Sequence, residues 1–291
     1  MNTHIFTTHI KQFSTVLTLG VFSVLSFFGF VLQASAAEHE VKSISVHLAA
    51  PIVGHIGFMP ITATLISVWV TMVILITVAY FAGKNPKLIP SKLQSTFEVL
   101  LGSVFDYIAE VLESKSLAAK YFPIIMTIFI FVLSMNWFGL LPGVTSIGYY
   151  AMHGTESAFI PFLYPSATDL NITIAFAIVA FFTVEVAGVT VLGVWKYGKK
   201  FINFSSPLAF AIGIIELISE LARLIAFSFR LFGNIFAGKV LLLVVVFLTT
   251  PYIIPIPLIA YEAFVGFIQA FIFAILTLYF IKIAVEEPHQ H

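Results

Sequence analysis

The stretch ELISELARLIAFSFRLFGNIFAGK, residues 216–239, decides the fold class of this chain. It lies within a long apolar run, yet it carries two arginines, two glutamates, an asparagine and a lysine. An α-helix turns about 100° per residue, so Glu216, Arg223 and Arg230 share one face, which Asn234 extends. Each Arg or Lys at the middle of a bilayer costs roughly 2.5–3.5 kcal/mol. We therefore expect this face to turn toward protein, a water-filled cavity or a partner of opposite charge.

The composition of the 291 residues is that of a membrane protein. Hydrophobic residues make up 60% of the chain and charged residues 10%, whereas soluble domains carry about 25% charged residues. The 14 basic residues are balanced by 14 acidic ones and are spread over several loops, so no patch could hold a nucleic acid. The chain has no cysteine, which excludes disulfides, thiol catalysis and Cys-ligated metals.

Residues 1–36 are predicted to be a signal peptide. An apolar run over residues 13–32 follows Lys11 and closes on Ala34-Ser35-Ala36, an A-x-A cleavage signature. Because this run is longer than the usual stretch of about 7–15 residues, an uncleaved first membrane helix is the alternative. Residues 37–60 would then form an external N-terminal segment. Its histidines are spaced by eight residues, which is a poor ligand spacing, so no metal site is expected there.

Residues 61–285 are predicted to form a single all-α membrane domain of a polytopic protein. About five membrane-embedded helices are expected, over residues 61–82, 121–141, 171–195, 206–249 and 257–285. Residues 91–115 alternate apolar and charged side chains at helical spacing and are predicted to form an amphipathic helix, along the cytoplasmic interface or part-way into the membrane. A helix of about 44 residues would reach roughly 66 Å, more than twice the hydrocarbon thickness of about 30 Å, so the last two helices are expected to form a long tilted hairpin.

The distribution of lysines predicts the orientation of the chain. Two groups mark the cytoplasmic side: Lys84, Lys87 and Lys92, and then Lys196, Lys199 and Lys200. Residues 143–169 contain no Lys or Arg and are placed outside, as is the proline-rich turn before the last helix. We expect a bacterial cytoplasmic membrane, with the mature N-terminus outside and residues 286–291 as a cytoplasmic tail.

Polar residues on the middle spans leave alternatives open. The span that starts near Asn171 buries Glu185 and opens on Asp169. Asp169 and Asn171 suit either helix capping or, together with Glu185, a water-facing vestibule. Asn136 suits either a bridge between helices or the lining of a path.

The last helix carries Glu262 and Gln269, seven residues apart and therefore on one face. Lys239 and Glu262 lie at similar depths below the proline-rich turn and could pair. Such a pair would be a structural salt bridge or the lining of an outer access path. Arg223 lies about 10 Å nearer the cytoplasmic end than Arg230, where its long side chain is expected to reach water.

No motif for covalent chemistry is found in the chain. Residues 233–239 match part of a phosphate loop, but Val240 stands where Ser or Thr is needed and no strand precedes it, so nucleotide binding is not expected. No cofactor is implied either. A guanidinium stays protonated, so Arg230 cannot relay a proton but can attract a carboxylic acid on a partner. Buried ionisable groups of this kind suit the movement of a proton or another cation.

Residues 229–242, FRLFGNIFAGKVLL, resemble subunit a of the F-type ATP synthase membrane sector, whose signature is an arginine followed by LFGN. The resemblance extends to the segments 90–94, 139–143, 165–171 and 269–273, and it covers most of residues 55–287. It implies that Arg230 is the stator arginine facing a carboxylate of the c-ring, with Gln269 and Asn234 beside it. It also implies that Glu216 belongs to an aqueous half-channel.

The resemblance further implies c-ring subunits, peripheral-stalk b subunits and the lipid bilayer as partners. The chain departs from the best-known family pattern at two positions. Lys239 stands where that pattern has a carboxylate, and Glu262 where it has a histidine, so a polar pair is kept with its charges exchanged.

We therefore expect a stator with two offset aqueous half-channels that couples proton translocation to rotation of the ring. A stand-alone secondary ion transporter is the alternative, and it should show inverted repeats and broken helices. The ion-binding carboxylate would lie on the ring subunit, so both proton and sodium coupling remain open.

Overall fold

Five long helices dominate the computed structural model, which describes residues 50–57, 59–83, 92–141, 143–153, 156–202, 206–248 and 255–286. The predicted signal peptide, most of the external N-terminal segment, Lys84, Lys87, the turn before the last helix and residues 287–291 lie outside these ranges. The five helices are long and apolar enough to cross a membrane. They are α2 (Ala63–Gly83), α4 (Lys115–Phe138), α5 (Leu170–Leu192), α7 (Pro207–Leu248) and α8 (Pro255–Val285). The predicted fold class is confirmed.

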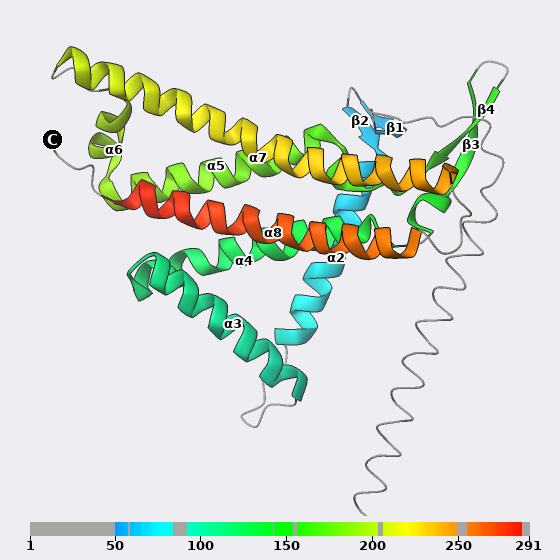
Figure 1. Ribbon diagram of the computed structural model, residues 1–291, viewed down its shortest axis with the longest axis horizontal. Helices are drawn as coiled ribbons and strands as arrows, with labels where there is room; N and C mark the ends of the chain where they lie inside the picture. Colours follow the sequence, from blue (N-terminus) through cyan, green and yellow to red (C-terminus); the bar gives the residue numbers. More distant parts are fainter. Residues whose placement is uncertain are drawn as a thin grey trace, which may run out of the picture.

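The core of the bundle is formed by α4, α5, α7 and α8, which pack on one another. Ile128 and Val132 of α4 and Leu231 of α7 are buried together with Phe273 of α8. The rings of Phe227 and Phe273 lie 4.8 Å apart and join α7 to α8. In Figure 1 these two helices run side by side toward one end of the molecule and diverge toward the other.

The helix α7 continues without a break for 42 residues and α8 for 31 residues. At about 1.5 Å per residue, α7 is roughly 63 Å long, so it exceeds the hydrocarbon thickness as predicted. Most side chains of α7 are at least partly exposed, because α5, α6, α8 and η2 each cover it along only part of its length.

The amphipathic helix is α3 (Lys92–Val111), which joins the bundle only near its C-terminal end. Ile108 is fully buried against α4 and α8, whereas Val99 is exposed. The chain then turns at Glu113, whose φ is positive, and Ser114 caps α4 by accepting a hydrogen bond from the Leu117 N–H. Figure 1 shows α3 leaving the bundle at an angle.

Two short antiparallel hairpins lie at the end of the bundle opposite α6 (Figure 1). One consists of β1 (Ile52–Ile56) and β2 (Met59–Thr62), the other of β3 (Gly148–His153) and β4 (Glu156–Pro161). The Tyr149 hydroxyl donates a hydrogen bond to the Val53 carbonyl and so joins them. Two 3-10 turns, η1 (Val144–Ser146) and η2 (Ser166–Thr168), continue this end. These elements are too small to change the fold class.

The third predicted span is shorter than expected, because α5 ends at Leu192 rather than near residue 195. Gly193 has a φ of 82°, a conformation that favours glycine, and it redirects the chain into the short helix α6 (Val194–Phe201). The ring of Tyr197 packs where a side chain at Gly188 would otherwise stand. The turn thus lays α6 against α5 and α7 and brings Lys200 to α7.

Candidate functional site

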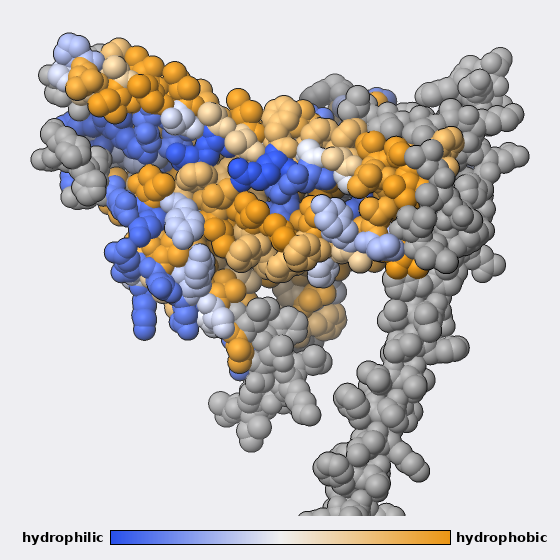
Figure 2. Space-filling model, viewed as in Figure 1, coloured by the Kyte–Doolittle hydropathy of each residue, from blue (hydrophilic) through white to orange (hydrophobic). Residues whose placement is uncertain are grey.

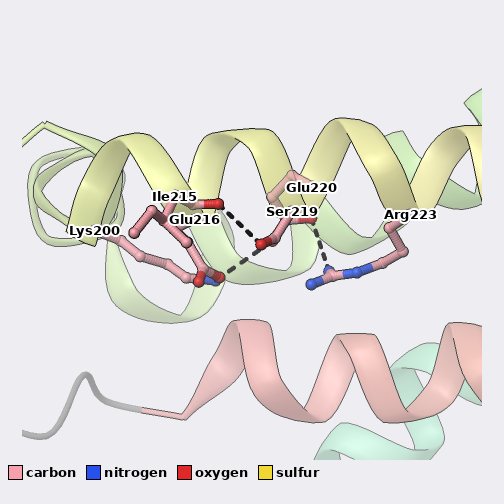
Figure 3. Close-up of polar contacts among 6 residues, drawn as sticks. All are labelled: Lys200, Ile215, Glu216, Ser219, Glu220 and Arg223. Atoms are coloured by element: carbon pink, nitrogen blue, oxygen red, sulfur yellow. Dashed lines mark hydrogen bonds and ion pairs between the residues drawn. The ribbon is translucent and has the colours of Figure 1, made fainter. Parts of the chain in front are cut away.

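Charged side chains from α5, α6 and α7 gather at the α6 end of the bundle, which is the predicted cytoplasmic end. Lys200 Nζ lies 2.8 Å from Glu216 Oε1 and 3.4 Å from Glu220 Oε1. Arg223 Nη1 lies 2.7 Å from Glu220 Oε2 (Figure 3). Glu220 therefore remains buried because two cations hold its carboxylate. We call the following residues the inner polar cluster: Glu185, Tyr197, Lys200, Glu216, Glu220 and Arg223.

Arg223 is held by contacts within the protein, and its side chain keeps only partial exposure to solvent. Its guanidinium lies 3.9 Å from the centroid of the Phe280 ring on α8, in addition to its ion pair with Glu220. The sequence led us to expect a side chain that reaches water. Glu220, one helical turn earlier, instead offers a carboxylate on the side of α7 that faces α8.

Glu185 of α5 belongs to the inner polar cluster because it lies beside Tyr197 of α6. Burial raises the pKa of the Tyr197 phenol above its usual value, and the neighbouring Glu185 carboxylate raises it further. Among the described residues, neither the Tyr197 hydroxyl nor Glu185 Oε1 has a hydrogen-bond partner.

The three residues that suited a vestibule are not brought together. Glu185 lies 16 residues after Asp169, which is about 24 Å along α5. Asp169 caps this helix, because its Oδ1 accepts a hydrogen bond from the Asn171 N–H at 2.9 Å. Its Oδ2 accepts a second one from the Thr64 hydroxyl at 2.7 Å. The capping alternative is therefore confirmed for Asp169.

A cavity of about 450 Å³ lies toward the hairpin end of the bundle, between α4, η1, η2, α7 and α8. We call it the outer cavity. The polar and charged side chains that line it come mainly from α4, α7 and α8: Asn136, Asn234, Lys239, Tyr261 and Glu262. Asn136 also donates a hydrogen bond to the Gly266 carbonyl at 3.0 Å. It thus bridges two helices, which confirms that alternative, and it also lines the cavity.

Lys239 and Glu262 share the outer cavity without forming an ion pair. Lys239 Nζ lies 3.3 Å from the centroid of the Tyr164 ring. Glu262 lies against Gly238, where an added Cβ would stand 3.3 Å from its Oε1 atom. Among the described residues, neither Lys239 Nζ nor Glu262 Oε1 has a hydrogen-bond partner. The structural salt bridge is therefore not formed, because the lysine turns toward Tyr164.

Arg230 and Gln269 lie between the inner polar cluster and the outer cavity, and Asn234 lines that cavity beside them. The Asn234 amide nitrogen donates a hydrogen bond to Gln269 Oε1 at 2.7 Å, and Gln269 is buried. Arg230 lies one turn before Asn234 and is exposed. Its guanidinium has no ion-pair or hydrogen-bond partner within the described part of the chain. Figure 2 shows a hydrophilic band where α7 and α8 run side by side, with hydrophobic residues on both sides of it.

Small exposed residues surround Arg230 on its side of α7. Helical geometry places Ala222, Ala226 and Ala237 within about 80° of Arg230, and all three are exposed. Small residues allow another helix to approach closely. Within the described ranges, no three His, Asp or Glu side chains gather closely enough to hold a metal ion.

Four residues of these regions were not singled out from the sequence. Glu220 could have been found, because it stands four residues after Glu216 and three before Arg223, within reach of ion pairing on a helix. Lys200 was interpreted only as a marker of orientation. Tyr164 gave no signal, because it contacts Lys239 from a segment about 75 residues away. Tyr197 gave none, because only the turn at Gly193 folds it back onto α5.

Comparisons with known proteins agree with this architecture. The family model described as ATP synthase A chain matches residues 65–282, which contain both polar regions. The chain is 30% identical over 227 residues to the ATP synthase subunit a of Moorella thermoacetica, covering 78% of this chain and 92% of that protein. It is 33% identical over 221 residues to ATP synthase subunit a 1 of Pelobacter propionicus and 32% identical over 224 residues to ATP synthase subunit a of Geobacter sulfurreducens, each covering 76% of this chain and 86% of the relative.

Proposed function

Because the chain belongs to the ATP synthase A chain family, we propose that it is the stator of the ATP synthase membrane sector and couples proton passage to rotation of a c-ring. The family and the five long apolar helices show that the chain is a multi-pass membrane subunit that takes part in ATP synthesis and ion transport. The two half-channels, the stator arginine and the route of the proton are our proposal.

The observation that carries the proposal is the position of Arg230. It is exposed and unpaired within the described residues, and it separates two polar regions that lie toward opposite ends of α7. A guanidinium without a partner in a membrane-spanning helix requires an anionic partner from another chain. A carboxylic acid on an apolar ring helix meets that requirement, and the small residues around Arg230 leave room for it.

In the proposed mechanism the outer cavity is the external half-channel. Protons from outside reach Glu262 and the region of Asn234 and Gln269, and they protonate a ring carboxylate. The neutral acid then rotates through lipid until it faces the inner polar cluster. There the proton is released toward Glu216 and the cytoplasm.

Arg230 has two electrostatic roles in this cycle. Its fixed positive charge favours the ionised form of the carboxylate that faces it and so promotes proton release. It also repels a proton that would pass straight from one polar region to the other. Because a guanidinium stays protonated, Arg230 performs both roles without taking up or losing a proton.

The proposed function also implies further partners and an orientation in the membrane. Peripheral-stalk b subunits and lipid would cover the exposed apolar faces, such as that of α2 with Trp69 and Ile76. The chain would lie in a bacterial cytoplasmic membrane with its mature N-terminus outside. A stand-alone transporter predicts broken helices near the membrane midplane, whereas α7 and α8 run unbroken through the region of Arg230 and Gln269.

The test is ATP-driven proton pumping by inverted vesicles, with assembly checked by immunoblot. We expect Arg230→Ala to abolish pumping and Arg223→Ala to retain a substantial part of it. Arg230→Lys should also fail substantially, because an ammonium can lose its proton when buried and lacks the planar fork of donors. Lys199→Ala, an exposed cation on α6, is the matched control and should pump normally. Full pumping by an assembled Arg230→Ala complex would refute the proposal.

A further inference from the structure

The contact between Lys239 and Tyr164 is a feature of the outer cavity that the proposed mechanism leaves unexplained. Lys239 Nζ lies 3.3 Å from the centroid of the Tyr164 ring, well within the distance at which a cation is attracted to an aromatic face. Burial raises the pKa of the Tyr164 phenol above its usual value. The phenol therefore stays neutral at physiological pH, and the contact depends on the ring face rather than on a negative charge.

The backbone fixes the position of Tyr164. Its N–H donates a hydrogen bond of 2.9 Å to the hydroxyl of Ser67, which is fully buried on α2. The next residue, Pro165, packs against Gly139 at the end of α4, where an added Cβ would stand 2.9 Å from the proline ring. The backbone at Tyr164 is thus anchored from α2 and α4, and its ring lies against the Lys239 ammonium.

The carboxylate of Glu262 lies in the same cavity and is held by a different neighbour. It packs against Gly238, the residue directly before Lys239. Opposite charges in a poorly solvated cavity gain most by forming a hydrogen-bonded pair. Here they do not, and Glu262 Oε1 is buried without a partner among the described residues.

We propose that Tyr164 is a positioning residue that keeps the Lys239 ammonium away from Glu262, so that the Glu262 carboxylate remains free to exchange protons with water from outside. This inference rests on the proposed function, because it concerns the outer half-channel. The titratable side chains that line the cavity are Lys239 of α7 and Tyr261 and Glu262 of α8, and Tyr164 contacts Lys239. The lining residues of α4, η1 and η2 carry no titratable group.

Removing the ring face has a defined consequence. Lys239 is then free to swing toward Glu262, and a close positive charge favours the ionised form of a carboxylate. Proton uptake from outside then needs a lower external pH. Tyr164→Phe keeps the ring face and should keep the lysine in place, whereas Tyr164→Leu removes the ring face.

The test measures ATP synthesis by inverted vesicles at a series of lumenal pH values, with the outer pH and a potassium diffusion potential held constant. The lumen of such vesicles corresponds to the outside of the cell. We expect Tyr164→Leu to move the lumenal pH midpoint down by about one unit, which is the lower end of the effect of an opposite charge at close range. Tyr164→Phe should keep the original midpoint, as should Tyr149→Leu, an aromatic control in the β3–β4 hairpin that does not line the cavity.

Lys239→Gln distinguishes positioning from a structural defect. If Tyr164 acts through the lysine, then adding Tyr164→Leu to Lys239→Gln should not move the midpoint further. The inference is overturned by an unchanged midpoint in Tyr164→Leu, by an equal shift in Tyr164→Phe, or by a shift that persists without the lysine. Tyr164→Met, which also lacks a ring, replaces Tyr164→Leu if that variant fails to assemble. Any of these three results would overturn the role of Tyr164 but leave the dependence of pumping on Arg230 intact. Failure of this inference is therefore distinct from failure of the proposed function.

Discussion

The ion pair between Arg223 and Glu220 predicts a specific pattern of stability changes. Replacing Arg223 with methionine removes a guanidinium nitrogen 2.7 Å from the Glu220 carboxylate and a contact with the Phe280 ring. The Glu220 side chain is only 3% exposed, whereas that of Arg223 is 17% exposed. After the change, Glu220 keeps only Lys200 at 3.4 Å, and Glu216 shares that lysine at 2.8 Å.

The size of the effect follows from what each variant leaves behind. Removing one partner of a buried ion pair costs roughly 3–5 kcal/mol. Lys200 still compensates part of the Glu220 charge, so we expect about 2–3 kcal/mol for Arg223→Met. Glu220→Gln removes the most buried charge and should cost less, about 1–2 kcal/mol. The double variant leaves no orphan charge, because Lys200 keeps Glu216, and it should cost less than the sum by about 1–3 kcal/mol.

The measurement is the thermal midpoint of the purified, assembled complex, followed by fluorescence-detected size-exclusion chromatography of heated samples. Each kcal/mol corresponds to a shift of roughly 2–4 °C for a chain of this size. Lys199→Met, an exposed lysine on the same short helix as Lys200, is the control and should leave the midpoint unchanged. Strictly additive shifts of the two single variants, or an Arg223→Met complex as stable as the control, would refute the reasoning.

Three further predictions concern other parts of the chain. Cysteines introduced into this cysteine-free protein at Tyr150 and Lys199 should be labelled by an impermeant reagent from the outside and the cytoplasmic side respectively, and the reverse pattern would contradict the orientation. Asp169→Ala removes the cap of α5 and the acceptor for a buried threonine, so we expect a loss of about 1–3 kcal/mol, seen as a lower thermal midpoint, whereas Asp169→Asn should lose less. The hydrogen bond from Lys282 lowers the pKa of Glu113, so the stability from this contact is present above the unfolded pKa and is lost as the pH falls through the folded value. Wild type should therefore be more stable than Glu113→Gln at neutral pH, as measured by the thermal midpoint, and this advantage should disappear in strong acid; an equal difference at both pH values would contradict the prediction.

The long helices could be predicted because their signal is local. The prolines that begin α7 and α8 and the length of their apolar runs fix both helices to within two residues of the expected bounds. The end of α5 could not be predicted as well, because the run of apolar residues continues past Gly193 and only the positive φ of that residue redirects the chain. The hairpins depend on pairing between neighbouring strands and on contacts such as that of Tyr149 with Val53, which no periodicity reveals.

The polar stripe on α7 could be predicted from a spacing of seven residues, but its partners could not. Lys200 reaches Glu216 and Glu220 only because the turn at Gly193 lays α6 against α7. For Lys239 and Glu262, counting residues from the proline-rich turn gave similar depths, and both indeed line one cavity. Depth does not fix the direction in which a long side chain points. The ring of Tyr164, supplied by a segment about 75 residues away, decides that direction.

The two polar regions differ in a way that bears on the proposed route of the proton. In the outer cavity Lys239 and Glu262 form no ion pair, and each keeps a buried polar atom without a hydrogen-bond partner among the described residues. In the inner polar cluster, ion pairs tie together four residues: Lys200, Glu216, Glu220 and Arg223. Within that cluster the Glu216 side chain is 30% exposed and contacts one cation, while that of Glu220 is 3% exposed and contacts two. A carboxylate that accepts a proton must be reachable by water and must not lose two ion pairs when it is neutralised. Glu216 meets both conditions and Glu220 meets neither. In the proposed mechanism, Glu216 therefore receives the released proton, and Glu220 fixes the two cations beside it.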